Sequence, residues 1–121
     1  MNNKSKMKVY ANGTKRWFLN DKLHREGGPA VECSDGSRYW YLNGQLHRED
    51  GPAVEYPDGT KNWYLNGKRH REDGPAVELP NGKKSCYLNG ERFSFEDCIQ
   101  ELRKLRGEDA VINLLFNLDA V

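Results

Sequence analysis

The sequence lacks a long hydrophobic run, and this absence argues against a membrane-spanning helix. No stretch of its 121 residues approaches the ~18 consecutive apolar residues that such a helix needs. The first eight residues are polar and lack the apolar segment of a secretory signal peptide. We therefore expect a cytoplasmic protein.

Cysteine is scarce, and neither sign of charge dominates. Cys33, Cys86 and Cys98 form no C-x-x-C pair, so we expect neither a disulfide framework nor a zinc site and interpret them as small buried apolar side chains. Nineteen basic residues are balanced by 18 acidic ones, for a net charge of +1. Because a dedicated nucleic-acid binder carries an excess of basic side chains, nucleic acid is an unfavoured partner. No cofactor is expected.

What the sequence does contain is a tandem repeat. The pattern His-Arg-Glu-x-Gly-Pro-Ala-Val-Glu occurs three times, 23 residues apart, at 24–32, 47–55 and 70–78. A period of this size is typical of a supersecondary unit that buries its apolar face only against its neighbours. A fourth unit is degenerate, as expected at the end of an array. It has Cys86, Phe93 and Ser94 where the other units have Trp, His and Arg.

Each unit is predicted to be a β-hairpin. An aromatic segment leads into Asn-Gly at 43–44, 66–67 and 89–90, a dipeptide suited to the positive φ angles of a two-residue type I′ turn. Between units, segments such as 56–60 (Tyr-Pro-Asp-Gly-Thr) are typical of a three-residue loop with Gly in the left-handed region. This loop predicts three cross-strand pairs of opposite charge: Glu32 with Arg38, Glu55 with Lys61 and Glu78 with Lys84.

The predicted fold is mainly β, an elongated, twisted antiparallel sheet of β-hairpin repeats with a short C-terminal helical cap. We expect a flexible N-terminus at 1–7, about 3.5 repeats over 8–93, and a helical segment at 94–121. Ser94 begins a capping-box-like sequence and Gly107 suits a helix end, with a second helix to follow. Either the helices cap the open end of the sheet, or they present an apolar patch to a partner, which includes a second copy of the chain.

The repeated His, Arg and Glu side chains invite a catalytic or metal-binding reading, and the repetition argues against both. A catalyst needs one asymmetric arrangement. Successive His residues would lie roughly 10 Å apart, too far for one ion with Zn–N bonds of ~2.0 to 2.1 Å. In a two-residue hairpin each His falls opposite a Trp, so we interpret these residues as a structural ladder. Its members are Trp17, Trp40, Trp63, His24, His47 and His70.

A second set of repeated side chains is the candidate binding surface. An aromatic row is expected on the sheet face opposite the Trp row, where nearby Arg side chains would hold a ligand or peptide by stacking and cation–π contact. The alternatives are an ordinary packed face or a cover beneath the helices. The set comprises Phe18, Tyr41, Tyr64, Tyr87, Arg25, Arg48 and Arg71.

The segment Trp-Tyr-Leu-Asn-Gly followed by His-Arg-Glu-Asp-Gly-Pro-Ala, at 40–53 and 63–76, resembles divergent MORN-like repeats of bacterial and viral proteins, including antitoxin-like ones. The resemblance covers about residues 8–93. It implies a β-hairpin solenoid that acts as a scaffold or binding surface, without a catalytic residue set. We therefore expect a non-enzymatic protein that binds another protein, as an inhibitor or adaptor in a bacterial cell or an infected host cell. A nucleotide-binding protein and a self-assembling scaffold are the alternatives.

Overall fold

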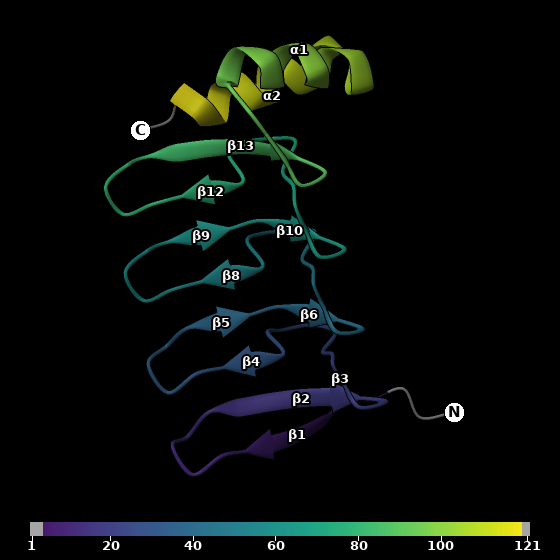
Figure 1. Ribbon diagram of the computed structural model, residues 1–121, viewed down its shortest axis with the longest axis vertical. Helices are drawn as coiled ribbons and strands as arrows, with labels where there is room; N and C mark the ends of the chain where they lie inside the picture. Colours follow the sequence, from purple (N-terminus) through teal and green to yellow (C-terminus); the bar gives the residue numbers. More distant parts are fainter. Residues whose placement is uncertain (1–3, 120–121) are drawn as a thin grey trace.

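The computed structural model describes residues 4–119 and shows an elongated stack of β-hairpins with two helices at one end (Figure 1). The mainly β architecture predicted from the sequence is confirmed. The strands are β1 (Lys6–Val9), β2 (Lys15–Leu19), β3 (Lys22–Leu23), β4 (Val31–Glu32), β5 (Arg38–Tyr39), β6 (Tyr41–Leu42), β7 (Gln45–Leu46), β8 (Val54–Glu55), β9 (Lys61–Asn62), β10 (Tyr64–Leu65), β11 (Lys68–Arg69), β12 (Val77–Glu78), β13 (Lys84–Leu88) and β14 (Glu91–Phe93). The helices are α1 (Phe95–Arg106) and α2 (Glu108–Asp119).

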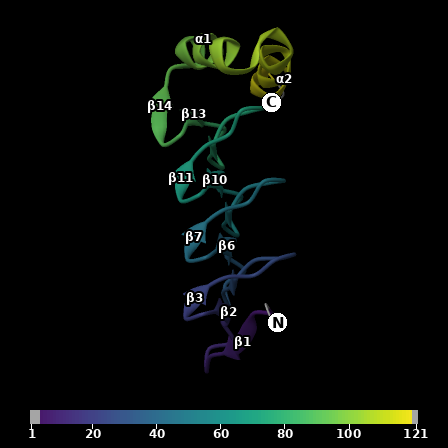
Figure 2. The same ribbon diagram turned by 90° about the vertical axis from the view of Figure 1, so that its right-hand side faces the viewer.

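The strands form one long antiparallel sheet with a column of short hairpins beside it. The sheet order is β1-β2-β4-β5-β8-β9-β12-β13-β14, and β3 pairs with β2. The hairpins β6–β7 and β10–β11 are separate two-stranded pairs. Figure 2 shows β3, β7, β11 and β14 aligned in one column, so equivalent positions of successive repeats lie above one another.

Both predicted turn types are present. Asn43 and Gly44 have φ angles of 51° and 80°, as a type I′ turn requires. Gly59 has a φ of 97° and donates its N–H to the Tyr56 carbonyl at 3.0 Å, which closes the three-residue loop. The resulting register confirms the three predicted pairs: Glu32 with Arg38, Glu55 with Lys61 and Glu78 with Lys84.

The N-terminal boundary differs from the expectation. Residues 1–3 lie outside the described part of the chain, but Lys6 and Met7 belong to β1, inside the segment 1–7 expected to be flexible. The cause is pairing with β2: Lys6 lies opposite Phe18, and Met7 lies opposite Trp17. The sheet therefore begins two residues earlier than the repeat pattern indicates.

The helices cover the C-terminal end of the sheet. The Ser94 hydroxyl accepts a hydrogen bond from the Asp97 N–H at 3.1 Å, and the Gly107 N–H donates to the Arg103 carbonyl at 3.0 Å. The core of this region joins both helices to β13 and consists of Cys86, Leu88, Cys98, Leu102 and Leu114. The helices therefore cap this end of the sheet, as the first alternative predicts, while Ile112 and Phe116 of α2 stay exposed. Within residues 4–119, neither helix is long and apolar enough to cross a membrane.

Candidate functional site

The repeated arginine lies over the tryptophan of its own hairpin. The guanidinium carbons of Arg25, Arg48 and Arg71 lie 3.8, 4.0 and 3.9 Å from the ring centroids of Trp17, Trp40 and Trp63. Three copies of one geometry show that this stack is part of the repeat. A guanidinium at this distance is attracted by the ring face and also covers its apolar surface.

Further contacts fix each arginine in place, as Arg48 shows. Its Nη1 donates to the Pro52 carbonyl at 3.0 Å and lies 3.3 Å from Glu55 Oε2. A Cβ added at Gly51 would lie 2.8 Å from its Cζ, so the observed position of the guanidinium leaves no room for a side chain there. The Arg, the Gly-Pro step and the final Glu of the motif therefore act together to hold one side chain on the Trp.

The histidine connects one repeat to the next. His24 Nδ1 accepts a hydrogen bond from the backbone N–H of Asn43 at 2.9 Å, and His47 and His70 do the same for Asn66 and Asn89. With Nδ1 as the acceptor, the neutral ring carries its proton on Nε2. The predicted register, with His opposite Trp, is confirmed by backbone bonds such as His47 N–H to Trp40 carbonyl at 3.0 Å. The packing of His on Trp stays a prediction, and the arginine stack on the same rings was not predicted.

Carboxylates lie along the outside of these stacks. The side chains of Glu26, Glu49, Asp50 and Asp73 are 85, 84, 88 and 66% exposed. Glu72 is the exception at 27%, because His70 Nε2 bonds it at 3.0 Å and Arg106 of α1 bonds it at 2.8 Å. Burial acts to raise the pKa of Glu72, but these two hydrogen bonds outweigh it and hold the pKa below its usual value.

Three cavities follow one another along this edge, and we call them together the loop groove. The first, of about 350 Å³, is lined by Trp17, Arg25 and Glu26 and also by Lys4 and Ser5 of the N-terminal segment. The second, of about 630 Å³, shares Arg25 and Glu26 with the first and adds Trp40, Arg48, Glu49 and Asp50. The third, of about 380 Å³, shares Arg48, Glu49 and Asp50 with the second and extends to Trp63 and Asp73. Because neighbouring cavities share wall residues, the row extends over three repeats.

The structure separates the two halves of the predicted binding surface. Arg25, Arg48 and Arg71 are held on the Trp rings. The row of Phe18, Tyr41, Tyr64 and Tyr87 projects to the other face, because successive strand residues alternate, and all four residues are half-buried. Arg69 supplies a cation to that row, with its guanidinium carbon 5.7 and 5.4 Å from the ring centroids of Tyr64 and Tyr87.

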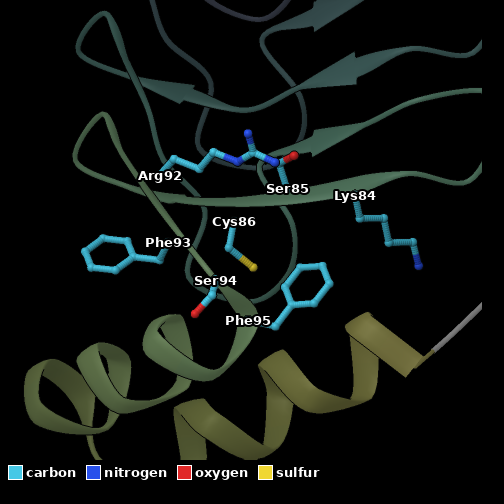
Figure 3. Close-up of a pocket in the computed structure, with 7 residues that line it drawn as sticks. All are labelled: Lys84, Ser85, Cys86, Arg92, Phe93, Ser94 and Phe95. Atoms are coloured by element: carbon cyan, nitrogen blue, oxygen red, sulfur yellow. The ribbon is translucent and has the colours of Figure 1, made fainter.

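The groove ends where the repeat degenerates. A cavity of about 530 Å³ lies between β13, β14 and the start of α1, with Phe95 and the Cys86 side chain on the helix side of β13 (Figure 3). Cys86 occupies the Trp position, so the repeated Trp–Arg stack is not continued in this cavity. A hydrogen bond with the Cys98 thiol and burial together raise the pKa of Cys86 and keep it a neutral thiol. The residues that line this cavity are Lys84, Ser85, Cys86, Arg92, Phe93, Ser94 and Phe95.

The exposed acidic side chains are the site residues that sequence reasoning missed. Their signal was present in the repeated segments 24–32, 47–55 and 70–78, which together contain three Arg and eight Asp or Glu residues. The cross-strand pairs account for only the final Glu of each copy. The remaining carboxylates needed another explanation, and the structure places them at the mouth of the loop groove.

The part of the chain that the structure describes contains no set of side chains that could bind a metal ion. Across residues 4–119, no three His, Cys, Asp or Glu side chains come together as an ion would require. Comparison of the chain with protein-family models, with curated proteins and with solved structures gives no match. The MORN-like resemblance stays a prediction from the sequence.

Proposed function

We propose that this protein is a non-catalytic interaction module that binds a basic, extended segment of another protein in the loop groove. The observation that carries the proposal is the row of three adjacent cavities with one repeated lining, a Trp–Arg stack beside exposed carboxylates. One lining repeated in register suits a repetitive or extended partner better than a single compact ligand.

The charge of the groove favours a cationic partner. Each stacked arginine already faces a carboxylate of its own repeat, at 3.5 Å for Arg25–Glu32 and 3.3 Å for Arg48–Glu55. The outer carboxylates Glu26, Glu49 and Asp50 are more than four-fifths exposed, and Asp50 also accepts a hydrogen bond from Arg48 Nε at 3.1 Å. A Lys or Arg side chain of a partner gains their attraction, and its aliphatic part gains contact with the edge of the stack.

The repeat sets a spacing for that partner. Each unit adds two strands to the long sheet, for example β4 and β5, which corresponds to roughly 10 Å along the stack. A chain in the polyproline II conformation advances ~3.1 Å per residue and completes a turn every three residues, so about three partner residues span one repeat and every third side chain points the same way. A segment with a basic residue at every third position therefore places one cation in each cavity.

The proposal is tested with synthetic peptides titrated against the full chain, with tryptophan fluorescence as the readout because Trp40 and Trp63 line the groove. Peptides with Lys or Arg at every third position are expected to bind more tightly than peptides of equal charge with another spacing. The double variant Glu49→Gln/Asp50→Asn should weaken binding about tenfold, the loss of one charge-assisted contact of ~1.4 kcal/mol.

The matched control is Glu91→Gln/Glu96→Gln, which removes the same number of exposed negative charges away from the groove. Equal weakening by both double variants would reduce the effect to net charge and contradict the proposal. A complete lack of binding by basic peptides would contradict it as well. The alternative of a nucleotide-binding protein is less well supported, because carboxylates at the cavity mouths repel phosphate.

A partner of this kind suits an inhibitor or adaptor of bacterial or phage origin. Basic, extended segments are common in proteins that bind nucleic acid. A module that covers such a segment would block that binding by competition, without any catalytic step.

A further inference from the structure

The outer face of the helical cap is apolar. Ile112, Leu115 and Phe116 of α2 are 59, 39 and 76% exposed. Their spacing of three and four residues puts them on one side of the helix. Val111 and Leu114, which are 1 and 0% exposed, face the core. One side of α2 thus closes the sheet, and the other side presents apolar surface to solvent.

The opposite end of the molecule is an open strand. Strand β1 stands last in the sheet order and pairs only with β2 among the described residues. All four residues of β1 are exposed, with Met7 at 51% and Val9 at 55%. Figure 1 shows β1 at one end of the long axis and the helices at the other. Among residues 4–119, the helices therefore cap one end of the sheet, and no element covers the edge of β1 at the other end.

The two ends carry opposite charge. Residues 4–19 contain five basic residues and no acidic one. Residues 94–119 contain six acidic residues and three basic ones. A contact between unlike ends is therefore attractive. A contact between like ends is opposed, because it would bring Lys6 and Lys8 of two copies together at one end, or two acidic caps at the other.

We propose that a second copy of this chain covers the open end, so that Ile112, Leu115 and Phe116 of one protomer pack on Met7 and Val9 of the next. Helix α2 would then cover a sheet end on each of its sides, one in its own chain and one in its neighbour. Such a head-to-tail contact joins two different surfaces. A bound pair therefore still has one unoccupied strand end and one unoccupied helix end, so further copies add to form linear oligomers instead of a closed symmetric dimer.

The test measures molar mass of the full chain by light scattering and sedimentation at increasing concentration. Small interfaces are weak, so growth in mass is expected at roughly 0.1 to 1 mM protein and should decrease as salt screens the charged ends. A wild-type chain that stays monomeric across this range at low salt would overturn the proposal.

Two single variants then distinguish head-to-tail contact from symmetric pairing. Met7→Asp places a charge in the proposed contact surface at the strand end, and Phe116→Asp does so at the helix end. Both positions are more than half exposed, so the substitutions should leave the fold intact. Each variant alone is expected to be monomeric. An equimolar mixture is expected to form dimers and nothing larger, because one intact strand end meets one intact helix end.

Two outcomes of the variant experiment would overturn the proposal. If Met7→Asp alone still dimerises, the contact is a symmetric one between helices. If the mixture of the two variants stays monomeric, the strand and helix ends do not bind each other. Neither variant lies in the loop groove, so a failure of this assembly leaves the peptide-binding experiment unaffected.

Discussion

The repeated body and the C-terminal cap are held together by different interactions. In the body the fully buried side chains are small, such as Ala30, Ala53 and Ala76 at 0% exposure, and the large Trp rings are only half-buried beneath arginine. In the cap, Leu102 and Leu114 are fully buried among other apolar side chains. The body relies on backbone ladders and repeated polar contacts, whereas the cap has a conventional hydrophobic core.

This difference has consequences for how stability is distributed. Each repeat contacts mainly its neighbours, so loss of one stack is a local loss shared with two adjacent units. The cap concentrates its apolar burial in a few side chains, so one truncation there removes a large part of its stabilising contacts. We therefore expect mutations in the cap to have larger effects than mutations in one repeat.

The largest effect is expected from Leu114→Ala. Removing a fully buried leucine leaves a cavity and costs about 3 kcal/mol. All three tryptophans lie in the body and both helices lie in the cap, so two probes separate the regions. Under urea, far-UV circular dichroism should report early loss of helix, while tryptophan fluorescence changes later and near the wild-type midpoint.

The control for this experiment is Leu115→Ala, one residue further along α2 but 39% exposed. It should leave both transitions close to those of the wild type. Coincident shifts of both probes in Leu114→Ala would show that cap and body unfold as one cooperative unit, which contradicts the proposed division.

The division between the repeated body and the cap could be predicted from the sequence, because each region has a regular sequence pattern of its own. The turns at 43–44 and 56–60, the charge pairs across the strands and the helix start at Ser94 all depend on local chemistry, and all are present in the structure. The start of β1 was missed because Lys6 and Met7 lie before the first recognisable repeat. Their strand conformation comes from pairing with Trp17 and Phe18, a tertiary effect.

The site was less predictable, since it depends on where long side chains fold. Arg48 can reach either sheet face from its loop, and nothing in the repeat spacing states that it lies over Trp40. The necessary information is spread over Gly51, the Pro52 carbonyl and Glu55, which act only once the loop has formed. Arg69, by contrast, stands opposite Tyr64 in a predicted hairpin and was accessible to sequence reasoning.

A smaller effect is expected from Gly51→Ala, which tests the body side of the comparison. The added methyl carbon would lie 2.8 Å from Arg48 Cζ, so the guanidinium must shift, and we expect it to leave the Trp40 ring. Loss of the stack and of the bond to the Pro52 carbonyl should cost about 1 to 2 kcal/mol. Urea titration followed by tryptophan fluorescence measures the cost.

A double-mutant cycle provides the control for this substitution. In an Arg48→Ala background the clash is absent, so Gly51→Ala should then cost close to nothing. Costs that add fully in the double variant would mean that Gly51 is required for its backbone conformation and would contradict the role assigned to the stacked arginine.

The smallest effect concerns the junction of the two regions, where Glu72 of the third repeat bonds Arg106 of α1 at 2.8 Å. The folded pKa of Glu72 lies below the ordinary value of 4.5. Its contribution to stability is therefore fully present above that value and is lost as the pH falls through the folded pKa. Acid should loosen the cap before the body, with helix signal lost ahead of tryptophan fluorescence below about pH 4.5.

The comparison of Glu72→Gln with Glu49→Gln isolates this junction, because both residues occupy the same motif position in successive repeats. Glu49 is 84% exposed and reaches no helix, so its replacement should leave the acid response unchanged. Glu72→Gln removes the carboxylate that titrates, so the helix signal should start weaker at neutral pH and lose most of its dependence on acid. An unchanged acid response in Glu72→Gln would place the pH-sensitive contact between cap and body elsewhere.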